Sequence, residues 1–206
     1  MIGILGGTFD PVHEGHFHIA MQVLNRLGLE QVQFVPCALP VHRDEPHASA
    51  SERCAMIELM IADEVAFVLN TLELDRGGLS FMIDSLREIR VETGSTLVLV
   101  LGADAFNDFA SWKAPHEILQ LVHLVVCHRP GYEVDPETFR EYRVDFPVAL
   151  SERSAGAILM LEVDANDCSS SEVRAALAQG HRPEQCVRPV VAHYIDEHHL
   201  YRKTVD

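Results

Sequence analysis

The chain has 206 residues, of which 48% are hydrophobic and 23% are charged, and its formal net charge is −15. This balance excludes a disordered or fibrous protein, and the acidic surplus excludes broad, nonspecific binding to nucleic acid, which needs a basic face. Because Lys113 and Lys203 are the only lysines, a pocket for an anionic substrate has to be built mainly from arginine and histidine.

The cysteines are odd in number and contain no CxxC pair. Such spacing is typical of neither a disulfide framework nor a zinc site, and it predicts reduced thiols in a cytoplasm. The sequence has no signal-peptide pattern and no apolar run of about 18 residues that could span a membrane. We therefore expect a cytoplasmic globular protein that binds neither a membrane nor nucleic acid. The cysteines are Cys37, Cys54, Cys127, Cys168 and Cys186.

The first half of the chain alternates apolar strands with amphipathic helices. A strand is predicted over 2–5 (IGIL), a helix over 15–27 and a second strand over 32–35 (VQFV), from the apolar spacing. A helix over 51–62 follows, for which Ser51 is the expected N-cap. A weaker strand over 67–74 and a helix over 80–91 complete this half.

The second half continues the alternation. Strands are predicted over 97–101 (LVLVL) and 121–127 (LVHLVVC), with a weaker one over 158–163, and helices over 170–177 and 187–198. The polar stretch 130–154, which contains proline, is the expected excursion from the core. Alternating strands and helices predict an α/β fold with a doubly wound, mostly parallel sheet, built as a single domain over 1–206.

The turn after the first predicted strand, GGTFDPVHEGH, has a composition that suits an anion. Gly6 and Gly7 let the backbone approach a ligand closely, and the helix that follows presents N–H groups and the positive end of its dipole. His13 and His16 lie three apart across the start of that helix, so both rings can donate hydrogen bonds to phosphate oxygens. The alternatives are a dinucleotide-binding loop, from which GxGxxG is absent, or merely a tight connection. His18, a single helical histidine, is expected at the surface or core edge.

A second motif, CSSSEVR, lies near the other end of the chain. Ser169, Ser170 and Ser171 supply hydroxyls and N-cap geometry, and Arg174 falls one turn into the helix that they start. Read alone, this cluster is typical of a capped surface helix. Together with the first turn it indicates a site for a triphosphate tail, held by N–H groups, hydroxyls and a guanidinium.

The two motifs resemble those of the nucleotidylyltransferase superfamily. His13-Glu14-Gly15-His16 is similar to HxGH, and 168–174 is similar to ISSTxxR, with Cys168 in place of isoleucine and Ser171 in place of threonine. Further stretches resemble the bacterial nicotinate-nucleotide adenylyltransferases over nearly the whole chain. These are Pro40-Val41-His42-Arg43 (PPHK/R), 73–86 (ExxRxGxSYTxxTL), 102–105, 112–113, 129–131 and the closing helix, 191–201.

The resemblance implies a Rossmann-like nucleotidylyltransferase fold whose C-terminal helices, about 169–200, complete the nucleotide site. The implied reaction joins ATP and nicotinate mononucleotide to give deamido-NAD and pyrophosphate, with Mg²⁺ held mainly by the ATP phosphates and no protein ligand to the metal. The implied catalytic residues are His13, His16 and Arg174. The implied ATP contacts are Gly6, Gly7, Thr8, Phe9, His13, His16, Gly102, Asp104, Ser169, Ser170, Ser171 and Arg174. The implied acceptor contacts are His42, Arg43, Ser80, Phe81, Met82, Trp112 and Lys113.

Several alternatives stay open at this point. Asp104 could hold the adenosine ribose or, with Asp10, lie behind the metal, and Trp112 could stack on a pyridine ring or be a packing aromatic. The acceptor could instead be nicotinamide mononucleotide, phosphopantetheine or an alcohol phosphate. A nucleotide sensor without turnover is a rival of another class, and a dehydrogenase is weakened by the missing GxGxxG loop. Homo-oligomerisation is left open.

Overall fold

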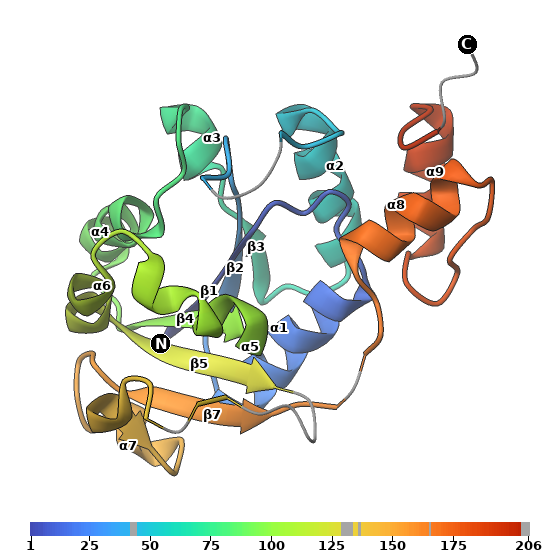
Figure 1. Cartoon of the computed structure of the whole chain (residues 1–206). Helices are drawn as coiled ribbons and strands as arrows, with labels where there is room; N and C mark the ends of the chain where they lie inside the picture. Colours follow the sequence, from blue (N-terminus) through green and yellow to red (C-terminus); the bar gives the residue numbers. More distant parts are fainter. Residues whose placement is uncertain (42–44, 129–133, 136, 165, 203–206) are drawn as a thin grey trace.

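The computed structural model describes residues 1–41, 45–128, 134–135, 137–164 and 166–202 (Figure 1). Within these residues the strands form one seven-stranded parallel sheet in the order β3-β2-β1-β4-β5-β7-β6. The predicted doubly wound parallel sheet is thereby confirmed. The strands are β1 (Ile2–Gly7), β2 (Gln31–Pro36), β3 (Phe67–Leu69), β4 (Leu97–Gly102), β5 (Val122–His128), β6 (Arg143–Val144) and β7 (Ile158–Glu162).

Helices cover both faces of the sheet. Apolar residues of α1, α2, α8 and α9 pack into one core cluster, and those of α4, α5 and α6 pack into the other. The bounds of the longer helices are α1 (Glu14–Leu27), α2 (Ala50–Ile61), α4 (Met82–Thr93), α6 (Pro115–Leu121), α8 (Ser170–Ala178) and α9 (Pro189–Glu197). The shorter ones are α3 (Leu72–Arg76), α5 (Ala103–Asn107), η1 (Phe109–Ser111), η2 (Arg140–Tyr142) and α7 (Val148–Ser151).

The strand β4 shows why its sequence has no polar position. Val98 and Val100 belong to the core cluster on one face, whereas Leu97, Leu99 and Leu101 belong to the cluster on the other. Because side chains alternate across a strand, a strand buried on both faces has to be apolar throughout. The run LVLVL therefore marks a central strand of a parallel sheet.

The strand order reverses between β1 and β4, the position at which open α/β sheets have a ligand-binding crevice. From β1 the chain moves outward through β2 and β3, and it returns to pair β4 with the opposite edge of β1. The turns that follow β1 and β4 therefore diverge at the carboxyl ends of these strands, which is where open α/β sheets bind ligands. In Figure 1 the strand arrows of β5 and β7 point toward the side on which α8 lies.

Two of the predicted elements have different bounds. The strand predicted over 67–74 ends at Leu69, because the Asn70 side chain accepts the N–H of Leu72 at 3.0 Å and a short helix begins there. The expected N-cap Ser51 is wrong: Ser49 caps α2 and accepts from the N–H of Glu52 at 3.3 Å, while the Glu52 carboxylate accepts the N–H of Ser49. This is the capping-box pattern SxxE.

The region between β4 and β7 contains structure that the sequence pattern did not predict. The chain folds into α5, η1 and α6 between β4 and β5. The expected excursion over 130–154, as far as the structure describes it, returns to the sheet, since β6 pairs with β7 and Leu150 is buried. No helix of the described residues is both long and apolar enough to cross a membrane.

The prediction of reduced thiols is wrong for two of the cysteines. Cys168 and Cys186 form a disulfide, although 18 positions separate them along the chain. The fold brings the segment before α8 against the segment before α9, with Cα atoms 5.4 Å apart, and no local sequence spacing encodes that approach. The free thiols are those of Cys37, Cys54 and Cys127.

We expect the disulfide to be measurable in two ways. The unfolded, unreduced protein should expose three titratable thiols, which rise to five after reduction. Replacing Cys186→Ser should lower the free energy of unfolding by about 2–4 kcal/mol in urea titrations, since a loop of this length is no longer closed in the unfolded chain. The matched control is Cys54→Ser, because Cys54 is a half-buried free thiol on α2. This variant should change the free energy of unfolding far less. Five thiols in the unreduced protein would contradict the bond.

Candidate active site

A buried arginine on α2 holds the turn between β1 and α1 in place. Arg53 on α2 is only 1% exposed, and its guanidinium donates to the carbonyl oxygens of Thr8 and Cys37, each at 2.8 Å. Phe9 follows with φ of 51°, in the left-handed region, and its buried ring packs 4.9 Å from the ring of His16. A positive φ at a phenylalanine costs about 1–3 kcal/mol, so the surrounding contacts fix the turn in one shape.

The two histidines of the turn lie against each other, as predicted. His13 is the N-cap of α1, and the ring centroids of His13 and His16 are 3.8 Å apart. The backbone N–H of His13 donates to Nδ1 of His16 at 3.3 Å. In a neutral imidazole one nitrogen accepts and the other carries the proton. Nε2 of neutral His16 is therefore a donor.

His13 lies deeper than His16. It is 6% exposed, and its Nδ1 is buried without a hydrogen-bond partner among the described residues. Burial lowers the pKa of His13 to about 4, against the opposing influence of the Glu172 carboxylate. At neutral pH this imidazole is consequently uncharged, whereas a buried cation would have been costly.

The second motif docks directly onto the first. The guanidinium of Arg174 donates to the backbone carbonyl of Asp10 at 2.6 Å, and the Ser170 hydroxyl donates to that of Pro11 at 3.0 Å. The backbone N–H of Glu14 donates to the carbonyl of Cys186 at 2.8 Å, so this N–H is not available to a ligand. The predicted convergence of the two ends of the chain is therefore present in the fold.

The serine cluster divides its tasks. Ser169 is the N-cap of α8 and accepts from the N–H of Glu172 at 3.2 Å. Ser170 binds the first turn, and exposed Ser171 lies 3.5 Å from the guanidinium of Arg174, from which its hydroxyl accepts. The helix cap expected from the sequence and a phosphate site are thus compatible, because different hydroxyls serve each.

Asp10, which the sequence suggested only as a residue behind the metal, has a structural role that the sequence pattern did not reveal. Its carboxylate is 4% exposed and accepts from the backbone N–H groups of His47 and Ala48, the ring of His47 and the Tyr201 hydroxyl. Burial alone raises the pKa of Asp10, but these hydrogen bonds outweigh it and hold the pKa below its usual value. Asp10 therefore stays ionised and ties the first turn to two distant segments.

Some of the residues expected to bind the acceptor lie close to the turn between β1 and α1. Met82 covers the carboxyl end of β1, since a Cβ added to Gly6 would lie 2.4 Å from the Met82 methyl group. The ammonium of Lys113 lies 4.3 Å from the ring centroid of Phe81 and 2.8 Å from the carboxylate of Asp84. These contacts bring the segments around 82 and 113 together.

The other acceptor residues have structural partners or lie outside the described residues. The Ser80 hydroxyl accepts the N–H of Ala38 at 2.8 Å, and half-buried Trp112 packs edge-to-face on Phe109 with centroids 5.5 Å apart. Trp112 thus packs as an aromatic of the core edge while part of it stays accessible. His42 and Arg43 lie outside the described residues.

The end of β4 faces the same crevice. Gly102 is the N-cap of α5, and a Cβ added to it would lie 2.6 Å from Oδ1 of Asp104. The carboxylate of exposed Asp104 therefore lies directly against the backbone at the end of β4, and a side chain at position 102 would displace it. No group of three or more His, Cys, Asp or Glu side chains within the described ranges could hold a metal ion.

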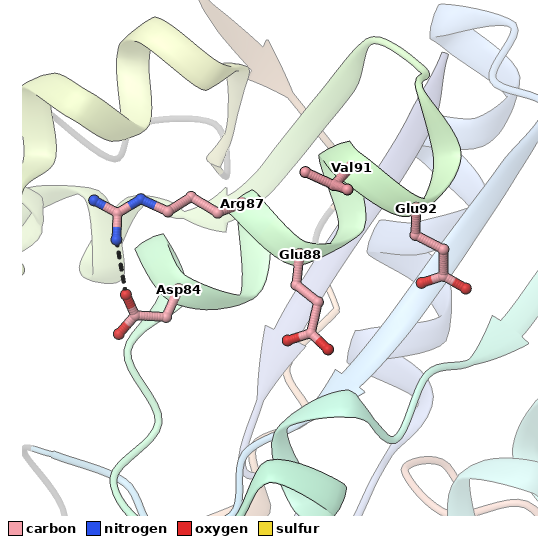
Figure 2. Close-up of a pocket in the computed structure, with 5 residues that line it drawn as sticks. All are labelled: Asp84, Arg87, Glu88, Val91 and Glu92. Carbon is pink, nitrogen blue, oxygen red and sulfur yellow. Dashed lines mark hydrogen bonds and ion pairs between the residues drawn. The ribbon is translucent and has the colours of Figure 1, made fainter.

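An open hollow elsewhere on the surface does not suit an anionic substrate. Figure 2 shows it on α4, lined by three acidic side chains, one arginine and one valine. Its arginine, Arg87, is already paired with Asp84 at 3.0 Å, so the hollow offers no unpaired positive charge. The lining residues are Asp84, Arg87, Glu88, Val91 and Glu92.

Comparisons with known proteins agree with this geometry. The cytidylyltransferase-like family model matches residues 4–176. Proteins named "Probable nicotinate-nucleotide adenylyltransferase" from Hydrogenovibrio crunogenus and Methylococcus capsulatus are 40% and 39% identical and match 98% of this chain and 98% and 100% of their own length. A solved nicotinic acid mononucleotide adenylyltransferase from Plasmodium falciparum, complexed with NaAD, is 18% identical with a TM-score of 0.78, over 97% of this chain and 96% of that one.

The burial of His13 predicts a loss of stability in acid. Because its pKa falls to about 4 in the folded protein from 6.5 in the unfolded chain, the unfolded state binds more protons between these values. This contribution, about 3 kcal/mol, is complete above pH 6.5 and is lost as the pH falls toward 4. Denaturant titrations of His13→Gln should therefore show a flatter dependence on pH than the wild type in that window. Parallel curves would contradict the burial of an uncharged imidazole.

Proposed function

Because the chain belongs to the nicotinate-nucleotide adenylyltransferase family of cytidylyltransferase-like proteins, we propose that it joins ATP and nicotinate mononucleotide. The products are nicotinate adenine dinucleotide (deamido-NAD) and pyrophosphate, a step of NAD synthesis. The observation that carries this function is the contact of Arg174 and Ser170 with the turn that bears both histidines, at the crevice of the sheet.

The reaction needs positioning and charge stabilisation more than a nucleophile from the protein. An oxygen of the mononucleotide phosphate attacks the α-phosphorus of ATP, and the bond to the β-phosphate oxygen breaks. The attacking group is already an anion, so no general base and no covalent enzyme intermediate are required. The protein holds two anions together and stabilises the charge on the transferred and leaving oxygens.

His16 is the proposed donor to the α-phosphate. Its Nδ1 accepts the N–H of His13, so in the neutral ring Nε2 carries the proton and would donate to an oxygen on which charge increases. His13 supports this ring by direct contact at 3.8 Å and, being uncharged, adds a polar imidazole without the cost of a buried cation.

The remaining ATP contacts come from both motifs. In the proposal Gly6, Gly7, Thr8 and Phe9 line the phosphates from the first turn, and Arg174, Ser170 and Ser171 bind the β- and γ-phosphates, with Ser169 setting the start of α8. Gly102 and Asp104, at the end of β4, contact the adenosine in this proposal, and the Asp104 carboxylate accepts hydrogen bonds from the ribose hydroxyls. In a chain with a net charge of −15, Arg174 is the cation that these contacts supply to the triphosphate.

A divalent cation belongs to this proposal as a companion of ATP. Mg²⁺ prefers phosphate oxygens and water, and it needs few protein ligands in such sites. The described part of the chain offers no cluster of ligands near the crevice, so the donor set fits an ion carried by the triphosphate. When bound, the ion neutralises charge on the leaving pyrophosphate.

The acceptor half of the site comprises His42, Arg43, Ser80, Phe81, Met82, Trp112 and Lys113. The proximity of Lys113 to Phe81 supports a shared pocket for the pyridine ring and its carboxylate, with Trp112 as a stacking surface. We further propose that residues 1–206 work as a single domain in the cytoplasm, completed by the C-terminal helices over about 169–200. Membranes and nucleic acid are not partners, and the state of association is left open.

A comparison of acceptors tests the assignment. Pyrophosphate release should be fastest with ATP–Mg²⁺ and nicotinate mononucleotide, because in the proposal the backbone N–H groups at the start of α4, near Phe81 and Met82, bind its carboxylate. Nicotinamide mononucleotide, phosphopantetheine and an alcohol phosphate serve as the competing acceptors in the same assay. A clear preference for phosphopantetheine would overturn the proposed acceptor while leaving the ATP half intact.

The variant His16→Ala separates an enzyme from a nucleotide sensor. Loss of one donor to the reacting phosphate should reduce kcat by roughly 100- to 1000-fold, while the Kd for ATP changes only a few-fold. His18→Ala, two positions on along the same helix, is the control and should retain wild-type turnover. If both binding and turnover fell equally in His16→Ala, the sensor would be the better explanation.

A further inference from the structure

The C-terminal end of the described chain reaches the phosphate site through one hydroxyl. Tyr201 lies beyond α9 and donates to Oδ1 of Asp10 at 2.8 Å, across 191 positions of sequence. Burial, together with the Asp10 carboxylate, raises the pKa of Tyr201, so the phenol stays protonated and remains a donor. Its own φ of 59° lies in the left-handed region, so the packing holds this residue in a costly conformation.

The contact matters because Asp10 also neighbours Arg174. Oδ1 of Asp10 accepts from Tyr201 and from the N–H of Ala48, and Oδ2 accepts from the N–H and ring of His47. The Arg174 guanidinium donates at 2.6 Å to the backbone carbonyl of Asp10, whereas the carboxylate oxygen Oδ2 lies 3.9 Å from it. The carboxylate is thus supplied with four other donors while the guanidinium stays at its edge.

We propose that Asp10 and Tyr201 are positioning residues that keep the Arg174 guanidinium directed at the ATP phosphates. The inference deepens the proposed function and rests on it, since it assigns Arg174 to the triphosphate. The backbone carbonyl of Asp10 accepts a hydrogen bond from Arg174 and so orients the guanidinium. The Tyr201 hydroxyl donates to the Asp10 carboxylate, and this hydrogen bond makes a close ion pair between the carboxylate and Arg174 less favourable.

The physical reason is a competition for one cation. Loss of the Tyr201 hydroxyl removes one of the four donors to the buried carboxylate, at Oδ1, and leaves more of its negative charge uncompensated. That charge attracts the Arg174 guanidinium, which lies 3.9 Å from Oδ2, toward a closer, charge-assisted pair. A guanidinium neutralised in that way binds phosphate more weakly. Removing the Tyr201 hydroxyl should therefore weaken ATP binding although Tyr201 touches no phosphate.

The test measures the Kd for ATP–Mg²⁺ by calorimetry in the full-length chain, without an acceptor. Tyr201→Phe should raise this Kd roughly three- to tenfold, the range of a typical net hydrogen bond, because the effect reaches ATP only through Arg174. In the complete reaction the same variant should raise KM for ATP more than KM for the acceptor. Tyr194→Phe is the matched control, because its half-buried ring stacks on His198 at 4.1 Å, away from Asp10, and its Kd should equal that of the wild type.

A double-mutant cycle distinguishes positioning from a general loss of structure. In an Arg174→Ala background, Tyr201→Phe should have no further effect on the Kd for ATP, because the group that it positions is gone. An unchanged Kd in the single variant, or the same fold-loss in both backgrounds, would overturn the proposal. A structural defect alone would lower the folded fraction and leave the Kd of the folded protein unaltered.

A second variant protects the test against misfolding of Tyr201→Phe. The His47 side chain is 62% exposed, so His47→Ala removes only the ring contact with Asp10 at 3.0 Å and leaves the backbone N–H in place. It should raise the Kd for ATP about twofold, and this rise should also vanish in the Arg174→Ala background; an additive effect would overturn the proposal. Because binding is measured without an acceptor, failure of the nicotinate assay in the wild type would reject the proposed reaction and not this inference.

Discussion

The contact between the Arg174 guanidinium and the Asp10 carbonyl joins two residues that are 164 positions apart, one near each end of the chain. With the hydrogen bonds from Ser170 to Pro11 and from Glu14 to Cys186, it places the histidines of the first turn next to the serines of the second motif. The contact depends in turn on Arg53, which supports the turn from α2, and on the hydrogen bond between Ser170 and Pro11. The place where we propose that the triphosphate binds is thus assembled from segments that several hydrogen bonds hold together.

Charge is distributed unevenly in this acidic protein. The buried or half-buried cations Arg53, Arg174 and Arg188 surround the first turn and its helix, and Arg188 pairs with Glu14 at 2.9 Å while it covers the ring of Phe17. Exposed carboxylates elsewhere supply the net charge of −15. Of the three arginines, Arg174 is the one assigned to the triphosphate in the proposal, and the uncharged state of His13 avoids adding a cation where burial would oppose it.

Most of the fold could be predicted because its strands are buried on both faces. Runs such as LVLVL and LVHLVVC admit no other environment in a chain of this length, and they became β4 and β5. The family was also evident from two motifs, and the comparisons confirmed it. The prediction of strand over 67–74 was wrong where one side chain, Asn70, diverts the backbone into a helix, since periodicity does not register a single hydrogen bond.

The sequence by itself determined the parallel α/β sheet, the placement of the histidine turn after the first strand and the presence of a second phosphate-type motif. These features follow from local periodicity and from residue types at short spacing. The tertiary structure alone decided that Asp10 meets Tyr201, that Arg53 carries the turn and that Cys168 bonds Cys186. Each of these contacts forms because helices pack on a sheet and bring distant residues together. The number of positions between two residues in the sequence does not predict such a contact.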